Sequence, residues 1–344
     1  MESTPQFDCD ETLVPPNARI LVAVSSGADS MALLCWLHEL GRDIVVGHVN
    51  HALEELRPGE CEADEASVRA KCAALNVPFR AVTVDLPRKN GHVNESVARD
   101  ARYLALTQMA RDNDCKLVAT AHTATDGLET ALLNLMRGGG PNGWQGVPPS
   151  RVLAGEIRLV RPLYKATRSS ARALLKSRGW NWREDASNLE PIFARNRVRA
   201  ELLPLLSDIS GRDLDELSRG HARGAQILRD EAALLEALGA RELSRLTIAR
   251  EPNLLSLSAP WFAELDIALQ RRVLRAAARQ MVPKLRDLSA EKVEIVRLSV
   301  SENRRRAVWS WPRGLRIEWT GPTRGNRIRL WRVGSETISG TSPD

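Results

Sequence analysis

The sequence predicts a doubly wound parallel α/β sheet, followed by a helical domain and a short β-rich C-terminal tail. Residues 20–150 alternate apolar runs with helical patterns, which is typical of a parallel sheet covered by helices. Residues 213–297 are rich in Leu, Ala, Arg and Glu at helical spacing, so we expect an all-helical segment there. From residue 307 onward apolar and basic residues alternate, which indicates a few antiparallel strands.

The elements of the first half follow one another in strict alternation. Apolar, β-branched runs predict strands at residues 20–24, 44–49, 79–84 and 117–121. Helical periodicity predicts helices at residues 30–40, 60–75, 94–111 and 126–136. After the Gly- and Pro-rich loop 138–149, we expect a further strand at 157–163 and a helix at 169–178.

Four tryptophans lie in the predicted C-terminal strands, namely Trp309, Trp311, Trp319 and Trp331. Tryptophan beside arginine can stack on nucleobases. Tryptophan on one face of a small sheet more often belongs to the core, and we favour that interpretation.

Composition indicates a cytoplasmic protein. No run of 18 apolar residues is present, so we expect no membrane span. The acidic, polar start lacks the basic and apolar regions of a secretory signal. Five cysteines without a C-x-x-C pair predict free thiols in a reducing compartment. The six histidines have no metal-site spacing, which argues against a structural zinc site.

Charge is divided unevenly along the chain. Residues 1–150 hold 13 Lys and Arg against 20 Asp and Glu, whereas residues 151–344 hold 36 against 23. A basic second half predicts contact with a polyanion, and arginine suits phosphate contacts and base stacking. An arginine-rich, solvated surface is the alternative.

The most informative motif joins the first strand to the first helix. The strand ends at Val24, and the turn consists of Ser25, Ser26, Gly27, Ala28, Asp29 and Ser30. A helix N-terminus presents N–H groups and partial positive charge, so this geometry can cradle phosphate. A carboxylate at Asp29 would repel bare phosphates, which predicts a bridging Mg²⁺. An ordinary helix cap at Asp29 or Ser30 is the structural alternative.

This turn resembles the S-G-G-x-D-S signature of the PP-loop (N-type ATP pyrophosphatase) superfamily. Ser26 stands where that superfamily usually has the first of two glycines. The resemblance implies that residues 25–30 bind ATP. The G-K-[ST] of a Walker A motif is missing from this turn, and the G-x-G-x-x-G at 138–143 follows a helix instead of a strand, so we reject a dinucleotide site there.

Further segments resemble the tRNA(Ile)-lysidine synthetase family, in family order across residues 18–206. They are His48-Val49-Asn50-His51, the helix containing Arg99, Arg102 and Tyr103, the segment His122–Thr130, the stretch Leu132–Gly138, and Arg195-Asn196-Arg197-Val198-Arg199. His48, His51 and His122 end predicted strands, which is the edge where ligands bind in open α/β sheets.

The segment after His122 departs from the family pattern A-H-H-x-D-D-Q-x-E-T. Thr123, Thr125 and Gly127 replace His, Asp and Gln, while Asp126 and Glu129 are retained. The two acids are three residues apart and share one face of a helix start. Their spacing alone equally fits first-turn acids that complement the helix dipole.

The resemblance implies an enzyme that adenylates the wobble cytidine of a CAU-anticodon isoleucine tRNA with ATP and Mg²⁺, then replaces AMP with free lysine. It implies catalytic roles for Asp29, Asp126 and Glu129, with Asp29 as the Mg²⁺ ligand. The implied substrate and tRNA contacts are His48, His51, Arg99, Arg102, His122, Arg195, Asn196, Arg197 and Arg199. It also implies a tendency to form homodimers.

Four regions are expected along the chain: an N-terminal extension at 1–17, a PP-loop catalytic domain at 18–206, a helical tRNA-binding domain at 207–300, and a β-rich segment at 301–344. Two alternatives stay open. A tRNA thiolase of the same superfamily would need reactive cysteines, and none is spaced for that role. A degenerate homologue that binds ATP or RNA without catalysis would explain the altered residues after His122.

Overall fold

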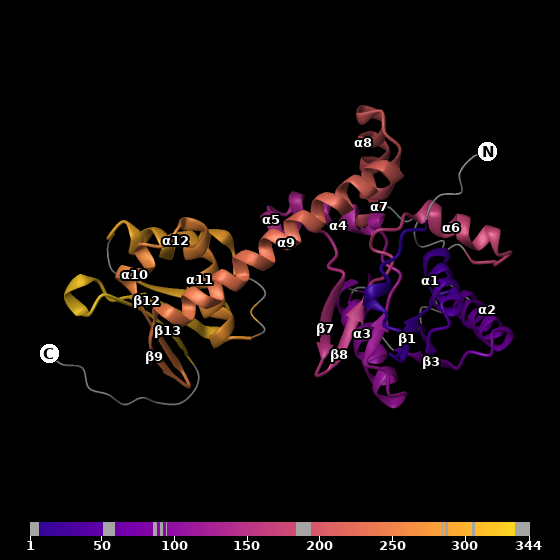
Figure 1. Cartoon of the computed structure of the whole chain (residues 1–344), viewed down its shortest axis with the longest axis horizontal. Coiled ribbons are helices and arrows are strands. Elements are labelled where there is room, and N and C mark those ends of the chain that lie inside the picture. The colour runs from indigo at the N-terminus through magenta and orange to yellow at the C-terminus, as the bar shows by residue number, and fades with distance from the viewer. Residues whose placement is uncertain are drawn as a thin grey trace. The chain divides into compact units, whose positions relative to one another are not determined.

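A computed structural model describes residues 7–50, 59–84, 88–89, 92–93, 95–183, 194–283, 285, 288–304 and 307–333. The chain divides into two compact units, Met1–Leu228 and Arg229–Asp344 (Figure 1). Within the described ranges, no helix is both long enough and apolar enough to cross a membrane.

Unit 1 is built on a six-stranded sheet with the order β3-β2-β1-β6-β8-β7. Its strands are β1 (Ile20–Ala23), β2 (Ile44–Asn50), β3 (Phe79–Thr83), β6 (Leu117–Ala119), β7 (Ser150–Ala154) and β8 (Ile157–Val160). The first five in spatial order are parallel, and β7 pairs antiparallel with β8 at the edge. The predicted parallel α/β sheet is therefore confirmed. The edge strand β7 was not predicted, because none of its residues is fully buried and no continuous apolar run marks it.

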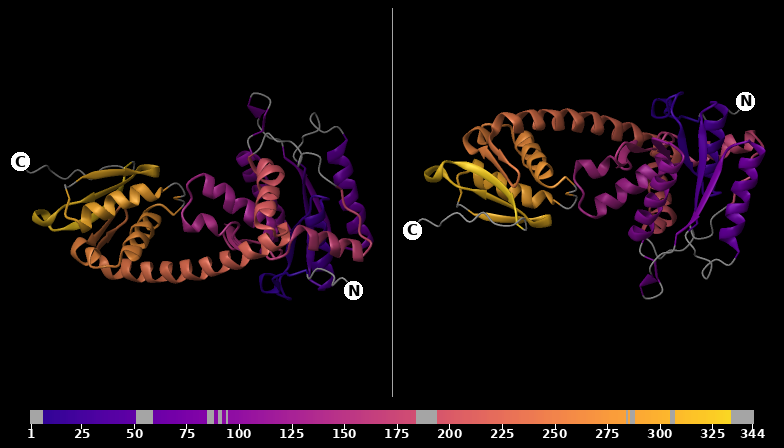
Figure 2. Two further views of the ribbon diagram at one scale, coloured as in Figure 1. Left: turned by 90° about the horizontal axis from the view of Figure 1, so that it is seen from above. Right: turned by 90° about the horizontal axis from the view of Figure 1, so that it is seen from below.

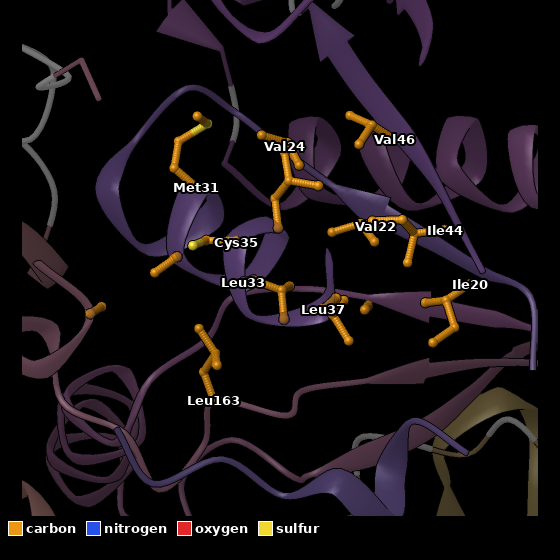
Figure 3. Close-up of a cluster of buried hydrophobic side chains, with 14 of the residues drawn as sticks. Ile20, Val22, Val24, Met31, Leu33, Cys35, Leu37, Ile44, Val46 and Leu163 are labelled. Atoms are coloured by element: carbon orange, nitrogen blue, oxygen red, sulfur yellow. The ribbon is translucent and has the colours of Figure 1, made fainter. Parts of the chain in front are cut away.

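Helices cover both faces of this sheet (Figure 1). One face packs against α1 (Ala28–Glu39), α2 (Glu60–Ala74) and α6 (Arg168–Ser177), and the other against α3 (Glu95–Asp112). Alternate residues of a strand point to opposite faces. Ile20 and Val22 accordingly join the α1 face, as Figure 3 shows, whereas Leu21 joins the α3 face.

Shorter elements complete unit 1. They are η1 (Glu11–Leu13), β4 (Arg88–Lys89), β5 (His92–Val93), α4 (Ala124–Met136), α5 (Pro141–Trp144), α7 (Ala194–Arg197), η3 (Val198–Leu202), α8 (Leu203–Ser210) and the first part of α9 (Leu214–Leu246). The segment η3 is a π-helical turn between α7 and α8. Leu128 of α4, Val198 of η3 and Leu203 of α8 form one small buried cluster that fixes these helices together.

The strand order creates a switch point between β1 and β6. From β1 the chain moves to β2 and β3 on one side, and later to β6 and β8 on the other side. Open α/β sheets bind ligands in the crevice outside the carboxyl ends of the strands at this point. The turn after β1 and the start of α4 both follow these carboxyl ends, so the sheet brings the two predicted motifs to one edge.

Unit 2 combines an antiparallel sheet with helices packed against it (Figure 2). The strand order is β11-β12-β13-β10-β9, with β9 (Thr247–Glu251), β10 (Leu254–Ser258), β11 (Val308–Trp311), β12 (Leu315–Trp319) and β13 (Arg327–Arg332). The other elements are α10 (Ala259–Ala263), α11 (Ile267–Met281), α12 (Ala290–Ser301), η4 (Pro312–Gly314) and η5 (Pro322–Arg324).

The prediction that residues 213–297 are all helical is wrong at 247–258. This stretch forms the hairpin β9–β10, and β10 also pairs with β13 from the C-terminal segment. Pro252 cannot continue a helix, and a partner strand is supplied from far along the chain, which local periodicity does not report. The expectation of a core role is confirmed for Trp311 and Trp319, which are 4% and 2% exposed.

Candidate active site

The turn between β1 and α1 is closed by its own side chains. Ser30 Oγ donates a hydrogen bond to the carbonyl oxygen of Gly27 at 2.9 Å and accepts one from the N–H of Ser25 at 3.1 Å. Gly27 is the N-cap and supplies no side-chain cap, so the first turn of α1, beginning at Ala28, can present its N–H groups to an anion. The arrangement fits the predicted phosphate cradle.

Ser26 holds the one strained backbone position of this turn. Its φ is +64°, in the left-handed region that favours glycine. Ser26 is also buried, and its carbonyl oxygen accepts a hydrogen bond from the N–H of Arg183 at 3.1 Å. Glycine adopts this conformation without strain, and this chain adopts it with serine.

His48 supports the turn from the neighbouring strand. Its buried Nδ1 lies 2.8 Å from the carbonyl oxygen of Val24, where β1 ends. That contact joins β2 to the start of the phosphate loop and does not direct the ring at the carboxylates. His51 lies outside the described residues.

Two carboxylates stand at the start of α4. Thr123 is the N-cap, and Asp126 Oδ2 accepts hydrogen bonds from the Thr123 N–H at 2.9 Å and its hydroxyl at 3.0 Å. This reciprocal capping box fixes the Asp126 side chain. Glu129 follows one turn later and is completely buried.

A single guanidinium connects these acids with the phosphate loop. Arg168, the first residue of α6, places Nε 3.4 Å from Asp29 Oδ2, Nη2 2.8 Å from Asp126 Oδ1 and Nη1 3.1 Å from Glu129 Oε1. Asp29, Asp126 and Glu129 therefore form one cluster. Arg168 itself was missed, although it follows the N-cap Thr167 as a basic first-turn residue, which is unusual at a helix N-terminus.

Two further arginines reach the cluster from the α7–η3 segment. Arg195 Nε lies 3.3 Å from Glu129 Oε2, and its Nη2 donates to Thr130 Oγ1 at 2.8 Å. Arg199 Nε lies 2.6 Å from Glu129 Oε1, and its Nη2 is 3.2 Å from Asp126 Oδ1. The structure thus brings these two predicted residues to the acids.

The other two predicted residues of that segment lie differently. Arg197 pairs with Glu201, four residues further along, and is exposed. Asn196 lies in α7 between Arg195 and Arg197. Position on the helix accounts for the contrast, because residues 195 and 199 are four apart and share a face that residue 197 does not.

Within the cluster, the pKa values of Asp29 and Asp126 are shifted in opposite directions. Burial, helped by the nearby charge of Asp126, raises the pKa of Asp29 to about 6, against the opposing effect of Arg168. Burial alone would also raise the pKa of Asp126, but Arg168, His122 and the Thr123 backbone N–H hold it well below its usual range. The three acids in turn outweigh burial and raise the pKa of Arg168. Asp126 therefore stays ionised. A cation added beside Asp29 would lower the pKa of Asp29 and favour its ionised form.

Apart from the acid cluster, a group of arginines surrounds Tyr103 on α3. The guanidinium carbons of Arg99, Arg102 and Arg151 lie 5.6, 5.5 and 4.6 Å from the centre of its ring. Although burial opposes ionisation, Arg161, Arg99 and Arg102 lower the pKa of Tyr103 to about 8. The predicted residues Arg99 and Arg102 are thus neighbours in space.

The pKa of His122 is affected both by the arginines around Tyr103 and by the acid cluster. Its Nδ1 lies 3.1 Å from the hydroxyl oxygen of Thr120. Burial, followed by the charge of Arg161, lowers the pKa of His122 to about 3, and Asp126 acts in the opposite direction. The ring is therefore neutral near physiological pH, which suits hydrogen bonding to a substrate better than charge pairing.

The three departures from the family motif have structural roles. Thr123 caps α4, and Thr125 lies buried with its hydroxyl 3.4 Å from the hydroxyl of Ser218 on α9. A Cβ added to Gly127 would lie 3.5 Å from the ring of His221. That distance is an ordinary van der Waals contact, so position 127 of α4 faces His221 of α9.

The donors of this cluster fit Mg²⁺. That ion prefers oxygen ligands and is usually held by one or two carboxylates together with substrate phosphates. Asp29 and Asp126 supply such oxygens beside the phosphate loop, and burial followed by the charge of Asp126 raises the pKa of Asp29. Asp29, with Asp126 beside it, is where the ion would be held.

Comparison with known proteins agrees with the geometry. Residues 4–206 match the PP-loop domain family. A tRNA(Ile)-lysidine synthase of Salinispora arenicola (strain CNS-205) is 35% identical over 311 residues, covering 89% of this chain and 90% of that protein. One from Gloeobacter violaceus is 36% identical over 267 residues, covering 76% and 77%. One from Dehalococcoides mccartyi (strain CBDB1) is 33% identical over 293 residues, covering 82% of this chain, which spans 60% of that relative's length.

A solved structure supports the fold independently. The U34-tRNA thiolase NcsA from Methanococcus maripaludis, with its [4Fe-4S] cluster, superposes with a TM-score of 0.52 at 13% identity, over 64% of this chain and 75% of that one. At that identity the likeness concerns the fold alone. The match to the PP-loop domain family and the two relatives covered to 77% and 90% show that the chain belongs to the tRNA(Ile)-lysidine synthase family of PP-loop proteins.

Proposed function

We propose that this chain joins lysine to C2 of the wobble cytidine of a CAU-anticodon isoleucine tRNA, consuming ATP through an adenylated cytidine. One observation carries the proposal: a phosphate-cradling turn and three acids connected by Arg168 lie together where β1 and β6 end, at the switch point of the sheet. The PP-loop domain supports ATP as the nucleotide. The names of the close relatives support lysidine formation as the reaction.

In the first step, O2 of cytidine attacks the α-phosphorus of ATP, and the bond to pyrophosphate breaks. The N–H groups at the start of α1 hold the pyrophosphate, and Gly27 lets the backbone come close to its oxygens. Mg²⁺ held by Asp29 would neutralise charge on the phosphates. The protein contributes mainly position and charge, as is usual for phosphoryl chemistry.

In the second step, the ε-amino nitrogen of lysine bonds to C2 of cytidine, and the bond to AMP breaks. The amine must lose a proton before it attacks, so an anchor and a base are both required. Asp126 holds its proton weakly, which suits an anchor for the lysine ammonium. Glu129 is the other carboxylate of the cluster at the start of α4, and it is the second candidate for anchor or base. Arg168 occupies the place between the acids that a substrate cation would take.

The basic second half of the chain would bind the tRNA. We assign this role to the regions 207–300 and 301–344, and we assign RNA or phosphate contacts to Arg99 and Arg102 near His122. We further propose a cytoplasmic location, where tRNA and ATP are present and the five free cysteines stay reduced. We also propose that the chain forms a homodimer, because the family that it resembles tends to dimerise.

A label at the α-phosphate of ATP tests the first step. In the absence of lysine, we expect label to accumulate in the tRNA, and added lysine should release it as labelled AMP. Asp29→Asn should abolish labelling but leave tRNA affinity within about twofold, because the site of chemistry and most phosphate contacts are separate. Failure of the wild-type chain to label a tRNA that it binds would favour a binding protein without catalysis.

The thiolase alternative needs an activated thiolate. Burial raises the pKa of Cys35, Cys72 and Cys115 to about 11, and it raises that of Cys9 further. Thiols with raised pKa are poor nucleophiles near neutral pH. The environments of these four cysteines therefore do not favour sulfur transfer.

A further inference from the structure

A basic cavity lies within unit 2, apart from the acids of unit 1. It encloses about 630 Å³ between the end of α9, the strand β9 and the helix α11. Its charged and amide-bearing walls are Glu236, Arg250, Arg272, Arg275, Arg279 and Gln280. A smaller recess of about 390 Å³ shares Arg250 and Gln280 and adds Glu251. Neither the motifs nor the proposed chemistry uses these residues.

The fold places three of these arginines in one row. Arg272, Arg275 and Arg279 follow at spacings of three and four on α11, so they share one face of that helix. A Cβ built on Gly239 of α9 would lie 2.6 Å from the Cβ of Arg272. The two helices thus cross at a distance that only glycine permits, which fixes Arg272 against α9.

The positive charge of the cavity is only partly balanced. Glu236 Oε1 lies 3.3 Å from both Arg272 Nη1 and Arg279 Nη1. Arg275 Nη1 donates to the carbonyl oxygen of Leu288 at 2.9 Å, which carries no charge.

The fourth arginine contacts a neutral amide. With the Gln280 amide oriented so that its oxygen faces Arg250, that oxygen accepts hydrogen bonds at 2.6 and 2.8 Å. Four guanidiniums and one carboxylate line the main cavity, which leaves an excess of three positive charges. With Glu251 of the smaller recess the excess is still two.

We propose that this cavity binds backbone phosphates of the RNA substrate. Guanidinium groups match phosphate oxygens in charge and in bidentate geometry. The volume falls in the range of small-ligand sites, so it can admit a phosphate with its sugar. Arg250 and Arg279 are exposed and can meet a chain from outside, whereas Arg272 and Arg275 lie deeper. The identity of the RNA as a tRNA rests on the proposed function; the phosphate site does not.

Removal of the two exposed arginines tests the proposal in the full chain. Arg250→Gln/Arg279→Gln should weaken affinity for a CAU-anticodon isoleucine tRNA transcript at least tenfold. The slope of log affinity against log salt should become shallower by about one for each phosphate that the variant no longer neutralises. Arg250→Lys/Arg279→Lys should retain most of that slope.

A charge-matched control belongs to the same unit. Arg241 on α9 and Arg304 after α12 are exposed and do not line the cavity. Arg241→Gln/Arg304→Gln removes the same charge from the same basic unit, so it should weaken tRNA affinity several-fold less than Arg250→Gln/Arg279→Gln does. Equal effects of the two double variants would overturn the proposal, because the loss of affinity would then follow net charge alone.

Two measurements separate the other outcomes. If Arg250→Gln/Arg279→Gln keeps tRNA affinity but loses binding of inorganic phosphate or ATP to unit 2, the cavity serves a free anion and the RNA assignment is overturned. If the cavity variant loses RNA affinity while the wild-type chain makes no lysidine, the phosphate site stands and the proposed function fails. If the wild-type chain makes lysidine and the cavity variant binds tRNA normally, the proposed function stands and the phosphate site fails.

Discussion

At the scale of single residues, Arg168 determines how the acids of the cluster are held. The acids lie in sequence motifs and were therefore predictable, whereas no motif marks Arg168. Its role depends on the tertiary structure, which brings the start of α6 beside α1 and α4. Three carboxylates converge on one guanidinium with 27% of its side chain exposed. Such a group stabilises the fold and holds the three carboxylates together.

We predict that Arg168→Met destabilises the protein and abolishes lysidine formation. Breaking a partly buried network leaves acids uncompensated and costs about 2–4 kcal/mol. Arg178→Met is the control, because Arg178 follows the other end of α6 and pairs with Glu39 in an exposed position. That exposed pair should contribute less than about 1 kcal/mol. Urea unfolding of both variants measures the difference, and similar losses would contradict this account.

Ser26 gives a prediction on backbone strain. Ser26→Gly relieves a left-handed conformation that costs a non-glycine residue about 1–2 kcal/mol, but it adds about 0.5–1 kcal/mol of chain entropy to the unfolded state. We therefore expect net stabilisation of up to about 1.5 kcal/mol, the difference of those two terms, with ATP binding retained. Thermal unfolding and ATP titration check this, and a clear loss of stability would show that the serine side chain contributes more than its backbone costs.

Tyr103 gives a prediction on pH. The folded-state pKa of about 8 lies below the usual value of 10, so the folded chain binds fewer protons than the unfolded chain between these values. Stability should therefore rise between about pH 8 and 10, by roughly 2.7 kcal/mol, and this gain is lost as pH falls through 8. The pKa of the second tyrosine, Tyr164, is instead raised.

Phenolate absorbance measures this directly. We expect one tyrosine to ionise near pH 8 and the other above pH 10. Tyr103→Phe should remove the first transition and the associated rise in stability. A single transition of two tyrosines near pH 10 would mean that the surrounding arginines do not act on the ring.

At the scale of elements, the sequence predicted what local periodicity determines. The strands and helices of the parallel sheet were placed within a few residues, because each carries a continuous apolar run or a regular helical face. The edge strand β7 and the hairpin β9–β10 were missed, because their pairing depends on partners elsewhere in the chain. The same limit applies to the site, where motifs marked the acids and only the tertiary arrangement brought Arg168 among them.

The crossing of α9 and α11 gives a prediction at this scale. Gly239→Ala would place a Cβ 2.6 Å from the Cβ of Arg272, a distance that requires the helices to separate. We expect a loss of about 1–3 kcal/mol, as for other overpacked cores. Gly224→Ala is the control, since its Cβ meets nothing within 4 Å, and it should be neutral or stabilising in the same helix. Equal stability of the two variants would contradict this description of the crossing.

At the scale of the whole molecule, the two halves of the sequence contribute opposite charges. The acidic first half supplies Asp29, Asp126 and Glu129, and the basic second half supplies the arginines that pair with them as well as the arginine cavity. Composition predicted a polyanion partner for the second half, but the cavity was invisible in the sequence because its walls come from α9, β9 and α11. We expect salt to weaken tRNA binding steeply, since neutralised phosphates release counterions.

The central claim is that this crevice makes lysidine, and nucleoside mass analysis tests it most directly. The purified chain is incubated with ATP, Mg²⁺, isotopically labelled lysine and a CAU-anticodon isoleucine tRNA transcript, and the tRNA is then digested to nucleosides. We predict a cytidine whose mass has increased by lysine less water, with the label, for the wild-type chain and none for Asp29→Asn. Unmodified cytidine from the wild-type chain, with the tRNA demonstrably bound, would contradict the account.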